Sequence, residues 1–89
     1  MRHHTTFRQL EIFEAIARLG SFTRASEELF LSQPTVSMQM KKLTDMIGAP
    51  LIEQVGKKIR LTADGQELAR ATREIFSILD HYTMSVDER

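Results

Sequence analysis

The chain has 89 residues, of which 42% are hydrophobic and 27% are charged, and its formal net charge at pH 7 is zero. This length allows one small domain with a modest core, and the absence of cysteine excludes disulfides and thiolate zinc sites. No apolar run is long enough to span a membrane, and residues 1–6 lack the apolar stretch of a secretion signal, so we expect a cytoplasmic protein.

The zero net charge conceals an uneven distribution along the chain. Residues 1–62 carry nine Lys and Arg against six Asp and Glu, a balance of +3, whereas residues 63–89 carry three bases against six acids, a balance of −3. Nucleic-acid binding normally leaves a basic signature, so the front of the chain permits such a partner. The acidic tail suggests a separate task.

The first predicted element is an amphipathic helix over residues 6–19. Thr6 is a suitable N-cap for it, and Gly20 is a suitable terminator. The apolar positions that recur at helical spacing and predict its buried face are Phe7, Leu10, Phe13, Ile16 and Ala17.

Residues 21–47 are predicted to form two helices joined by a tight turn. Ser21 caps the shorter helix and Ser32 caps the longer one, and Pro34 falls in a first turn, where its missing N–H costs nothing. One hydrophobic seam holds both helices together: Ala25, Leu29, Leu31, Val36, Met40, Leu43 and Ile47. This pattern predicts a helix-turn-helix, which indicates DNA.

The face of the longer helix opposite the seam is free to contact a partner. It carries Pro34, Met38, Lys41 and Asp45, with Thr35, Lys42 and Ser37 on its flanks. Its small, polar and flexible N-terminal members suit a major groove about 12 Å wide, and Lys41 is placed to reach a phosphate. For an isolated helical pair, an ordinary solvated face would be the better interpretation.

Residues 51–55 and 58–61 are predicted to form two short strands around Gly56-Lys57, a β-hairpin or wing. Lys57 and Lys58 lie at its tip, and Arg60 shares a strand face with Lys58. A wing that follows a recognition helix lies beside the same duplex and can place its cations along the backbone or in the minor groove. Exposed charges also keep a small hairpin soluble, so both interpretations apply to these residues.

Thr62 is predicted to cap a last helix, with Asp64 complementing the helix dipole. Its heptad seam consists of Leu68, Thr72, Ile75, Leu79, Tyr82 and Val86, and the apolar surface is widened by Ala71, Phe76 and Ile78. A helix of about 25 residues is roughly 37 Å long, more than this small domain can cover. We therefore predict that the seam pairs with a second copy, rather than folding back on its own domain.

Four blocks of sequence, in this order, resemble the N-terminal DNA-binding part of LysR-type transcriptional regulators. They are FTRASEEL at 22–29, LSQPTVS at 31–37, GAPLIE at 48–53 and LTADG at 61–65. The resemblance covers essentially the whole chain. It implies a mainly α fold, a winged helix-turn-helix of three helices and a two-stranded wing over residues 1–61, followed by a linker or dimerisation helix over residues 62–89.

The resemblance also implies the contacts with double-stranded DNA at a pseudo-palindromic operator, without a cofactor. The recognition helix, about 32–47, would enter the major groove, and the wing, 54–60, would lie on the backbone or minor groove. Thr23 would meet a phosphate. The implied DNA-binding residues are Thr23, Ser32, Gln33, Pro34, Thr35, Ser37, Met38, Lys41, Gln54, Lys57, Lys58 and Arg60.

Two of these positions depart from the commoner pattern of the family, which has Arg where Met38 and Gln54 stand. Reading of guanine or of the minor groove by those arginines is therefore not expected here. Met38 suits contact with a thymine methyl group, and Gln54 suits a hydrogen bond in a groove. Whether Met38 reads a base stays open.

Two further stretches resemble the branch that activates carbon-fixation (Calvin-cycle, RuBisCO) operons in autotrophic bacteria: EELFLSQPTVS at 27–37 and EQVGKK at 53–58. Complete members of the family carry a second domain that binds an inducer. We expect this chain to be part of such a longer regulator, without the effector domain, and to form a homodimer. A tetramer of the intact protein, the operator, the inducer and the sense of regulation stay open.

Neither catalysis nor metal binding is predicted. The chain has no Gly-rich phosphate loop and no two-His metal spacing on a helix. His3 and His4 are adjacent near the terminus, and His81 lacks a partner at ligand spacing. The stronger rival to DNA binding is a winged-helix module that makes only protein contacts and dimerises through its last helix, and salt dependence of DNA binding separates the two.

Overall fold

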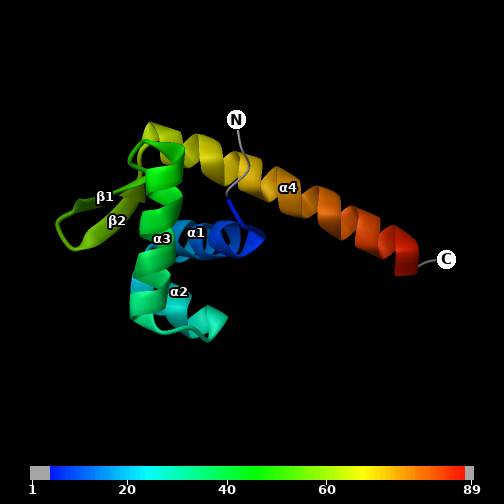
Figure 1. The fold of residues 1–89 in the computed structure, drawn as a ribbon, viewed down its shortest axis with the longest axis horizontal. Helices are drawn as coiled ribbons and strands as arrows, with labels where there is room; N and C mark the ends of the chain where they lie inside the picture. Colours follow the sequence, from blue (N-terminus) through cyan, green and yellow to red (C-terminus); the bar gives the residue numbers. More distant parts are fainter. Residues whose placement is uncertain (1–4, 88–89) are drawn as a thin grey trace.

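The computed structural model describes residues 5–87, which form four helices and a two-stranded antiparallel sheet. In chain order these are α1 (Phe7–Leu19), α2 (Phe22–Leu29), α3 (Gln33–Ile47), β1 (Ile52–Val55), β2 (Lys58–Leu61) and α4 (Ala63–Asp87). Helices α1, α2 and α3 pack together, the wing formed by β1 and β2 lies beside α3, and α4 leads away on the other side (Figure 1). The predicted winged helix-turn-helix is confirmed.

Helix starts and ends follow the capping residues that the sequence indicated. Four hydroxyl groups accept a hydrogen bond from the backbone amide three residues later, at 3.0 to 3.2 Å: those of Thr6, Ser21, Ser32 and Thr62. Gly20 and Gly48 end α1 and α3 in the left-handed region. No pattern indicated the end of α2, where Phe30 adopts φ 56° with its side chain 93% exposed.

The hydrophobic core lies between the first three helices and is closed by Leu51 and the start of α4. Its buried members are Ile12, Phe13, Ala15, Ile16, Ala25, Val36, Met40, Leu43, Leu51 and Ala69. The seam predicted for α2 and α3 is confirmed, because Leu29, Leu31 and Ile47 pack against this cluster. The core therefore fixes α3 against α1 and α2 and leaves its opposite face to solvent.

The prediction for Phe7 in the first helix is wrong. This residue was expected on the buried face, but it is 59% exposed. As the first residue of α1 it lies beyond the core between the three helices and faces α4, where its ring centroid lies 6.4 Å from that of Phe76. This aromatic pair is one contact between α1 and the last helix.

The wing is a hairpin with a two-residue turn at Gly56-Lys57, as predicted. Gly56 has φ 63°, the positive value that such a short turn requires at its first position. The strands pair antiparallel in the register Ile52↔Leu61, Glu53↔Arg60, Gln54↔Ile59 and Val55↔Lys58. Ile59 and Leu61 are half-buried and anchor the hairpin, so Lys58 and Arg60 point to solvent on the other face.

Helix α4 begins inside the domain and then leaves it. Gly65, Ala69 and Thr72 are buried, Phe76 is partly buried, and residues 77–87 are all exposed. The structure differs from the predicted dimerisation seam at its start, because Thr72 is buried in its own domain and Leu68 packs against the core. The exposed part of the seam begins with the next seam residue, Ile75.

No helix within residues 5–87 is long and apolar enough to cross a membrane. His3 and His4, which the sequence analysis considered as weak metal ligands, lie outside the described residues.

Candidate nucleic-acid interface

The N-terminal ends of α2 and α3 lie next to each other and carry exposed polar side chains. The Nε2 atom of Gln33 donates a hydrogen bond to Oγ1 of Thr23 at 2.9 Å. Beside this pair, Oγ of Ser32 donates to Oγ1 of Thr35 at 2.8 Å. The fold thus brings together four of the residues predicted to contact DNA, although Thr23 stands ten positions before Gln33 in the chain.

The outer face of α3 continues this polar surface toward its C-terminus. Pro34, Ser37, Met38 and Lys41 are all exposed, as predicted. Lys41 is not a free cation, because its Nζ lies 3.0 Å from Oδ2 of Asp45 one turn later. The spacing of four residues between a base and an acid on a helix was a signal for this ion pair.

The tip of the wing presents a second group of cations. Gln54, Lys57 and Lys58 are exposed, and neither lysine forms an ion pair within residues 5–87. Arg60 differs, because its Nε donates to Oε1 of Glu53 at 2.8 Å across the hairpin. The predicted two-residue turn places these two residues opposite each other, so this ion pair could also have been predicted from the sequence.

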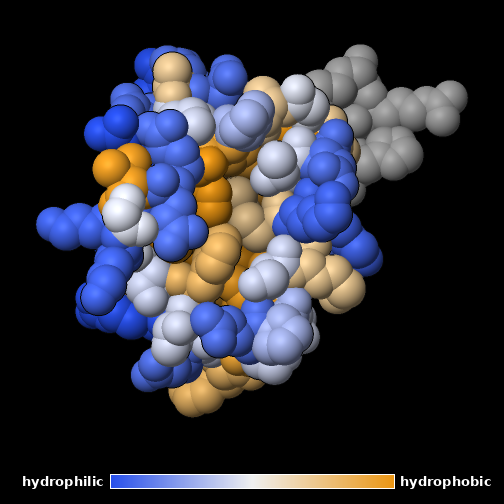
Figure 2. Space-filling model, turned by 90° about the vertical axis from the view of Figure 1, so that its left-hand side faces the viewer, coloured by the Kyte–Doolittle hydropathy of each residue, from blue (hydrophilic) through white to orange (hydrophobic). Residues whose placement is uncertain are grey.

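Polar and charged groups dominate the periphery of this side of the molecule. Figure 2 shows hydrophilic residues around a hydrophobic centre, on the side that faces left in Figure 1, where the wing projects. A ligand that approaches this side therefore meets exposed polar and charged groups around its edge.

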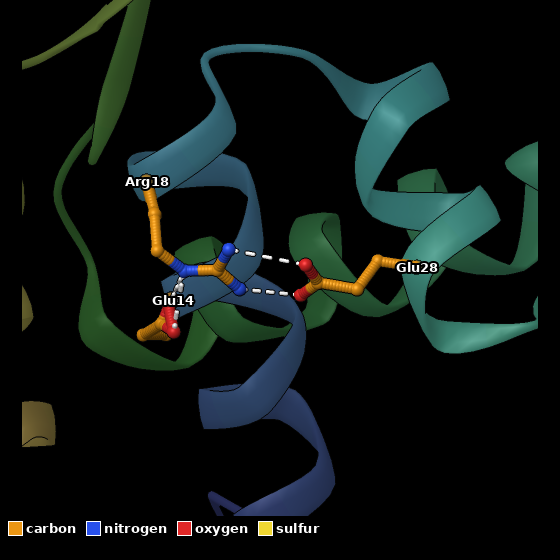
Figure 3. A network of polar contacts seen from close by, with 3 residues as sticks. All are labelled: Glu14, Arg18 and Glu28. Carbon is orange, nitrogen blue, oxygen red and sulfur yellow. Dashed lines mark hydrogen bonds and ion pairs between the residues drawn. The ribbon is translucent and has the colours of Figure 1, made fainter.

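A polar network joins the C-terminal ends of α1 and α2 (Figure 3). It is formed by other residues than the polar side chains at the N-terminal ends of α2 and α3. The Nε atom of Arg18 lies 3.0 Å from Oε2 of Glu14. The two terminal nitrogens of Arg18 donate hydrogen bonds to the two carboxylate oxygens of Glu28. The hydrogen bonds from Arg18 hold the pKa of Glu28 below its ordinary value, and those to Glu28 and Glu14 raise the pKa of Arg18. The network stabilises the position of α2, and its three residues are separate from the predicted DNA contacts.

The C-terminal half of α4 exposes several large apolar side chains. They are Ile75, Ile78, Leu79, Tyr82, Met84 and Val86. A groove of about 620 Å³ runs between α1 and α4 and is lined in part by Ala17, Phe76 and Met84. Exposed apolar surface of this extent on a small domain is typical of an interaction surface.

Within residues 5–87, no three His, Asp or Glu side chains gather in a way that could hold a metal ion. The Nδ1 atom of His81 lies 2.8 Å from the carbonyl oxygen of Ser77 in the same helix, so this ring nitrogen is engaged locally.

This chain is similar to a known protein family and to individual curated proteins. Residues 7–66 match the family described as "Bacterial regulatory helix-turn-helix protein, lysR family". The HTH-type transcriptional activator CmpR of Synechocystis sp. is 60% identical over 77 residues, which cover 86% of this chain and 25% of that protein. The RuBisCO operon transcriptional regulator of Allochromatium vinosum is 53% identical over 72 residues, which cover 81% of this chain and 24% of that protein.

Solved structures agree with the fold. The BenM DBD in its complex with catB site 1 DNA superposes with a TM-score of 0.88 at 25% identity, covering 93% of this chain and 92% of that one. The CbnR DBD in its DNA complex gives a TM-score of 0.84 at 31% identity, covering 93% and 95%. This chain spans about a quarter of the length of the curated relatives it matches. The chain belongs to the lysR family of bacterial regulatory helix-turn-helix proteins.

Proposed function

We propose that this chain binds double-stranded DNA sequence-specifically, as the DNA-binding and dimerisation part of a transcriptional regulator. The observation that carries the proposal is the exposed polar end of α3, next to α2, with a cationic wing beside the same helix. Residues 1–61 would form the DNA-binding domain, and residues 62–89 the dimerisation helix. The similarity to structures solved as DNA complexes supports this assignment.

In this proposal α3 enters the major groove with its N-terminal end first, so that Gln33 and Thr35 meet base edges. Lys57 and Lys58 of the wing lie along the backbone or in the minor groove. The ion pairs that hold Lys41 and Arg60 do not oppose this arrangement. An exposed ion pair contributes only about 0–1 kcal/mol, so a phosphate can replace the acid as partner.

The exposed half of α4 would pair with the same helix of a second copy through Ile75, Leu79, Tyr82 and Val86. Two linked domains bind paired half-sites far more tightly than one, which matters here because the front of the chain carries a balance of only +3. The operator would then be pseudo-palindromic, since a two-fold dimer reads two related half-sites.

We propose that the regulated genes are carbon-fixation genes. We also propose that the protein acts in the cytoplasm and that it is a regulator rather than an enzyme. Support comes from the relatives named RuBisCO operon transcriptional regulator in Allochromatium vinosum and Acidithiobacillus ferrooxidans, the second 46% identical over 83 residues, 93% of this chain and 27% of that protein.

The salt dependence of binding to a duplex tests the proposal. The logarithm of the affinity should fall linearly with the logarithm of the salt concentration, by about 0.9 per phosphate contact. Lys57→Ala should weaken all sequences alike and reduce this slope by about 1, whereas Gln33→Ala should change which base is preferred, by about 1–3 kcal/mol. Arg70→Ala, which removes an exposed cation on α4, is the matched control.

Fluorescence anisotropy with a labelled duplex measures both effects. Affinity that does not depend on salt, together with an unchanged base preference after Gln33→Ala, would favour the module that makes only protein contacts.

The dimer is tested by Leu79→Glu, which places a charge in the exposed seam. Sedimentation should show a smaller species, while circular dichroism keeps the helical signal of the front domain. Ser77→Glu places the same charge on the opposite side of α4 and serves as the control. If Leu79→Glu associates as strongly as the wild type, α4 does not form the dimer in this way.

A further inference from the structure

The hydrogen bond between Gln33 and Thr23 links two helices and also holds the side chain of Gln33. It joins the first turn of α3 to the first turn of α2, and both helices are fixed there. Ser26, which is buried, donates through Oγ to the carbonyl oxygen of Thr23 at 2.7 Å, and the Ser26 carbonyl accepts the amide of Leu31 at 3.0 Å. The Thr23 hydroxyl is therefore a well-placed partner for an exposed glutamine.

This contact engages only part of the Gln33 amide. The amide has two N–H donors and one carbonyl acceptor, and Thr23 takes one donor. Within residues 5–87, Oε1 of Gln33 forms no hydrogen bond, so one acceptor and one donor stay available to a ligand. In the major groove, adenine offers a donor and an acceptor side by side, N6–H and N7, whereas guanine offers two acceptors, O6 and N7.

Among the residues that the structure describes, the hydroxyl hydrogen of Thr23 is not donated to any acceptor either. Its oxygen accepts from Gln33, so its own O–H can donate to a phosphate oxygen of the same duplex. A chain of hydrogen bonds from phosphate to hydroxyl to amide to base would keep the hydrogen bond between Gln33 and Thr23 that the structure shows. Hydrogen bonds arranged in series polarise and strengthen one another.

We propose that Thr23 is a positioning residue that orients the Gln33 amide so that it selects adenine over guanine. The inference rests on the proposed DNA-binding function and deepens it, because it assigns a base to one side chain and a role to its neighbour. Without the Thr23 hydroxyl, the amide can turn and offer both N–H groups to guanine, and the discrimination between the two bases falls.

The experiment begins with the wild-type chain and a pool of randomised duplexes, from which the preferred sequence is selected. Binding of the selected duplex and of its single base-pair variants is then measured for each protein variant. The base pair at which Gln33→Ala abolishes the preference marks the position that Gln33 reads. Thr23→Val removes the hydroxyl at nearly constant shape, and Thr23→Ser restores it. Thr44→Val makes the same change near the other end of α3, away from the hydrogen bond between Thr23 and Gln33, and serves as the control.

We expect A·T at the marked position, and a loss of A·T over G·C discrimination of about 3- to 10-fold in Thr23→Val, the range for one hydrogen bond. Thr23→Ser and Thr44→Val should keep the discrimination. In a Gln33→Ala background, Thr23→Val should cause no further loss of discrimination, because the amide that Thr23 orients is absent.

Other outcomes overturn the inference in distinguishable ways. If Thr23→Val weakens all duplexes equally and keeps the base preference, Thr23 contacts only phosphate. G·C at the marked position contradicts the assigned orientation of the amide. If the wild type selects no sequence from the pool, the proposed function fails and the inference fails with it.

Discussion

Replacement of Gly65 by alanine is expected to destabilise the protein, although alanine is the better helix former. Gly65 lies in the first turn of α4 and is buried. A Cβ atom at this position would lie 1.9 Å from the carbonyl oxygen of Leu51 and 3.3 Å from Cβ of Leu61. A carbon atom cannot lie 1.9 Å from a carbonyl oxygen to which it is not bonded. Because this oxygen belongs to the backbone, the start of α4 must move away from Leu51 by about an ångström.

The magnitude follows from what this movement disturbs. The carbonyl oxygen of Leu51 accepts the amide of Thr62 at 3.1 Å, and the hydroxyl of Thr62 donates to the carbonyl oxygen of Pro50 at 2.7 Å. Overpacking of this kind costs about 1–3 kcal/mol, and the partial weakening of these two hydrogen bonds together adds about 1 kcal/mol. Against this, alanine gains about 1 kcal/mol of helix propensity over glycine. The net expectation is a destabilisation of about 2 kcal/mol.

Urea unfolding followed by circular dichroism measures this change, at one fixed protein concentration because association contributes to the stability of a dimer. A loss of about 2 kcal/mol corresponds to a melting temperature lower by about 10 °C for a domain of this size. Gly48→Ala is the matched control. A Cβ there meets nothing within 4 Å, so its cost arises only from φ 85° and amounts to about 1–2 kcal/mol. If Gly65→Ala is as stable as the wild type or more stable, helix propensity outweighs the close approach and the reasoning is refuted.

Three further changes test the capping, the core and the polar network. Ser32→Ala should lower the free energy of unfolding by about 1 kcal/mol, because the amide of Thr35 loses its partner; no change in urea unfolding would contradict the cap. Phe13→Ala should cost about 3–5 kcal/mol in the same assay, whereas Phe7→Ala, at an exposed position, should cost much less. Glu28 has a lowered pKa in the folded state, so the stabilisation it provides is present above its ordinary value of 4.5 and is lost as the pH falls through the folded value. The difference in stability between the wild type and Glu28→Gln should therefore be largest at neutral pH and disappear in acid; a difference that persists at low pH would show that the carboxylate charge is not its source.

Local signals explain why most of the architecture could be predicted. Hydroxyl residues at 6, 21, 32 and 62 satisfy open backbone amides whatever the tertiary context, and glycines at 20 and 48 tolerate the left-handed region. The seam through Val36, Met40 and Leu43 follows from helical periodicity alone. The two-residue turn after Val55 fixes the register of the wing and so the exposed face of its cations.

Other features depended on which surfaces met in three dimensions. Thr72 fits a heptad as well as Leu79 does, but Thr72 lies where α4 still crosses its own domain and Leu79 lies beyond it. Phe7 has the helical spacing of a core residue and faces α4 at the edge of the domain. Periodicity identifies an apolar face of a helix, but it does not indicate which partner covers that face.

The sequence by itself determined the elements, their ends, the buried face of α3 and the polar identity of its exposed face, because these depend on contacts between residues a few positions apart. Only the tertiary structure decided that Thr23 holds Gln33, that Leu51 approaches Gly65, and that α4 leaves the domain after Phe76. These depend on the angles at which packed helices and the wing meet. Those angles arise from the shapes of side chains distant in sequence, which no short-range pattern encodes.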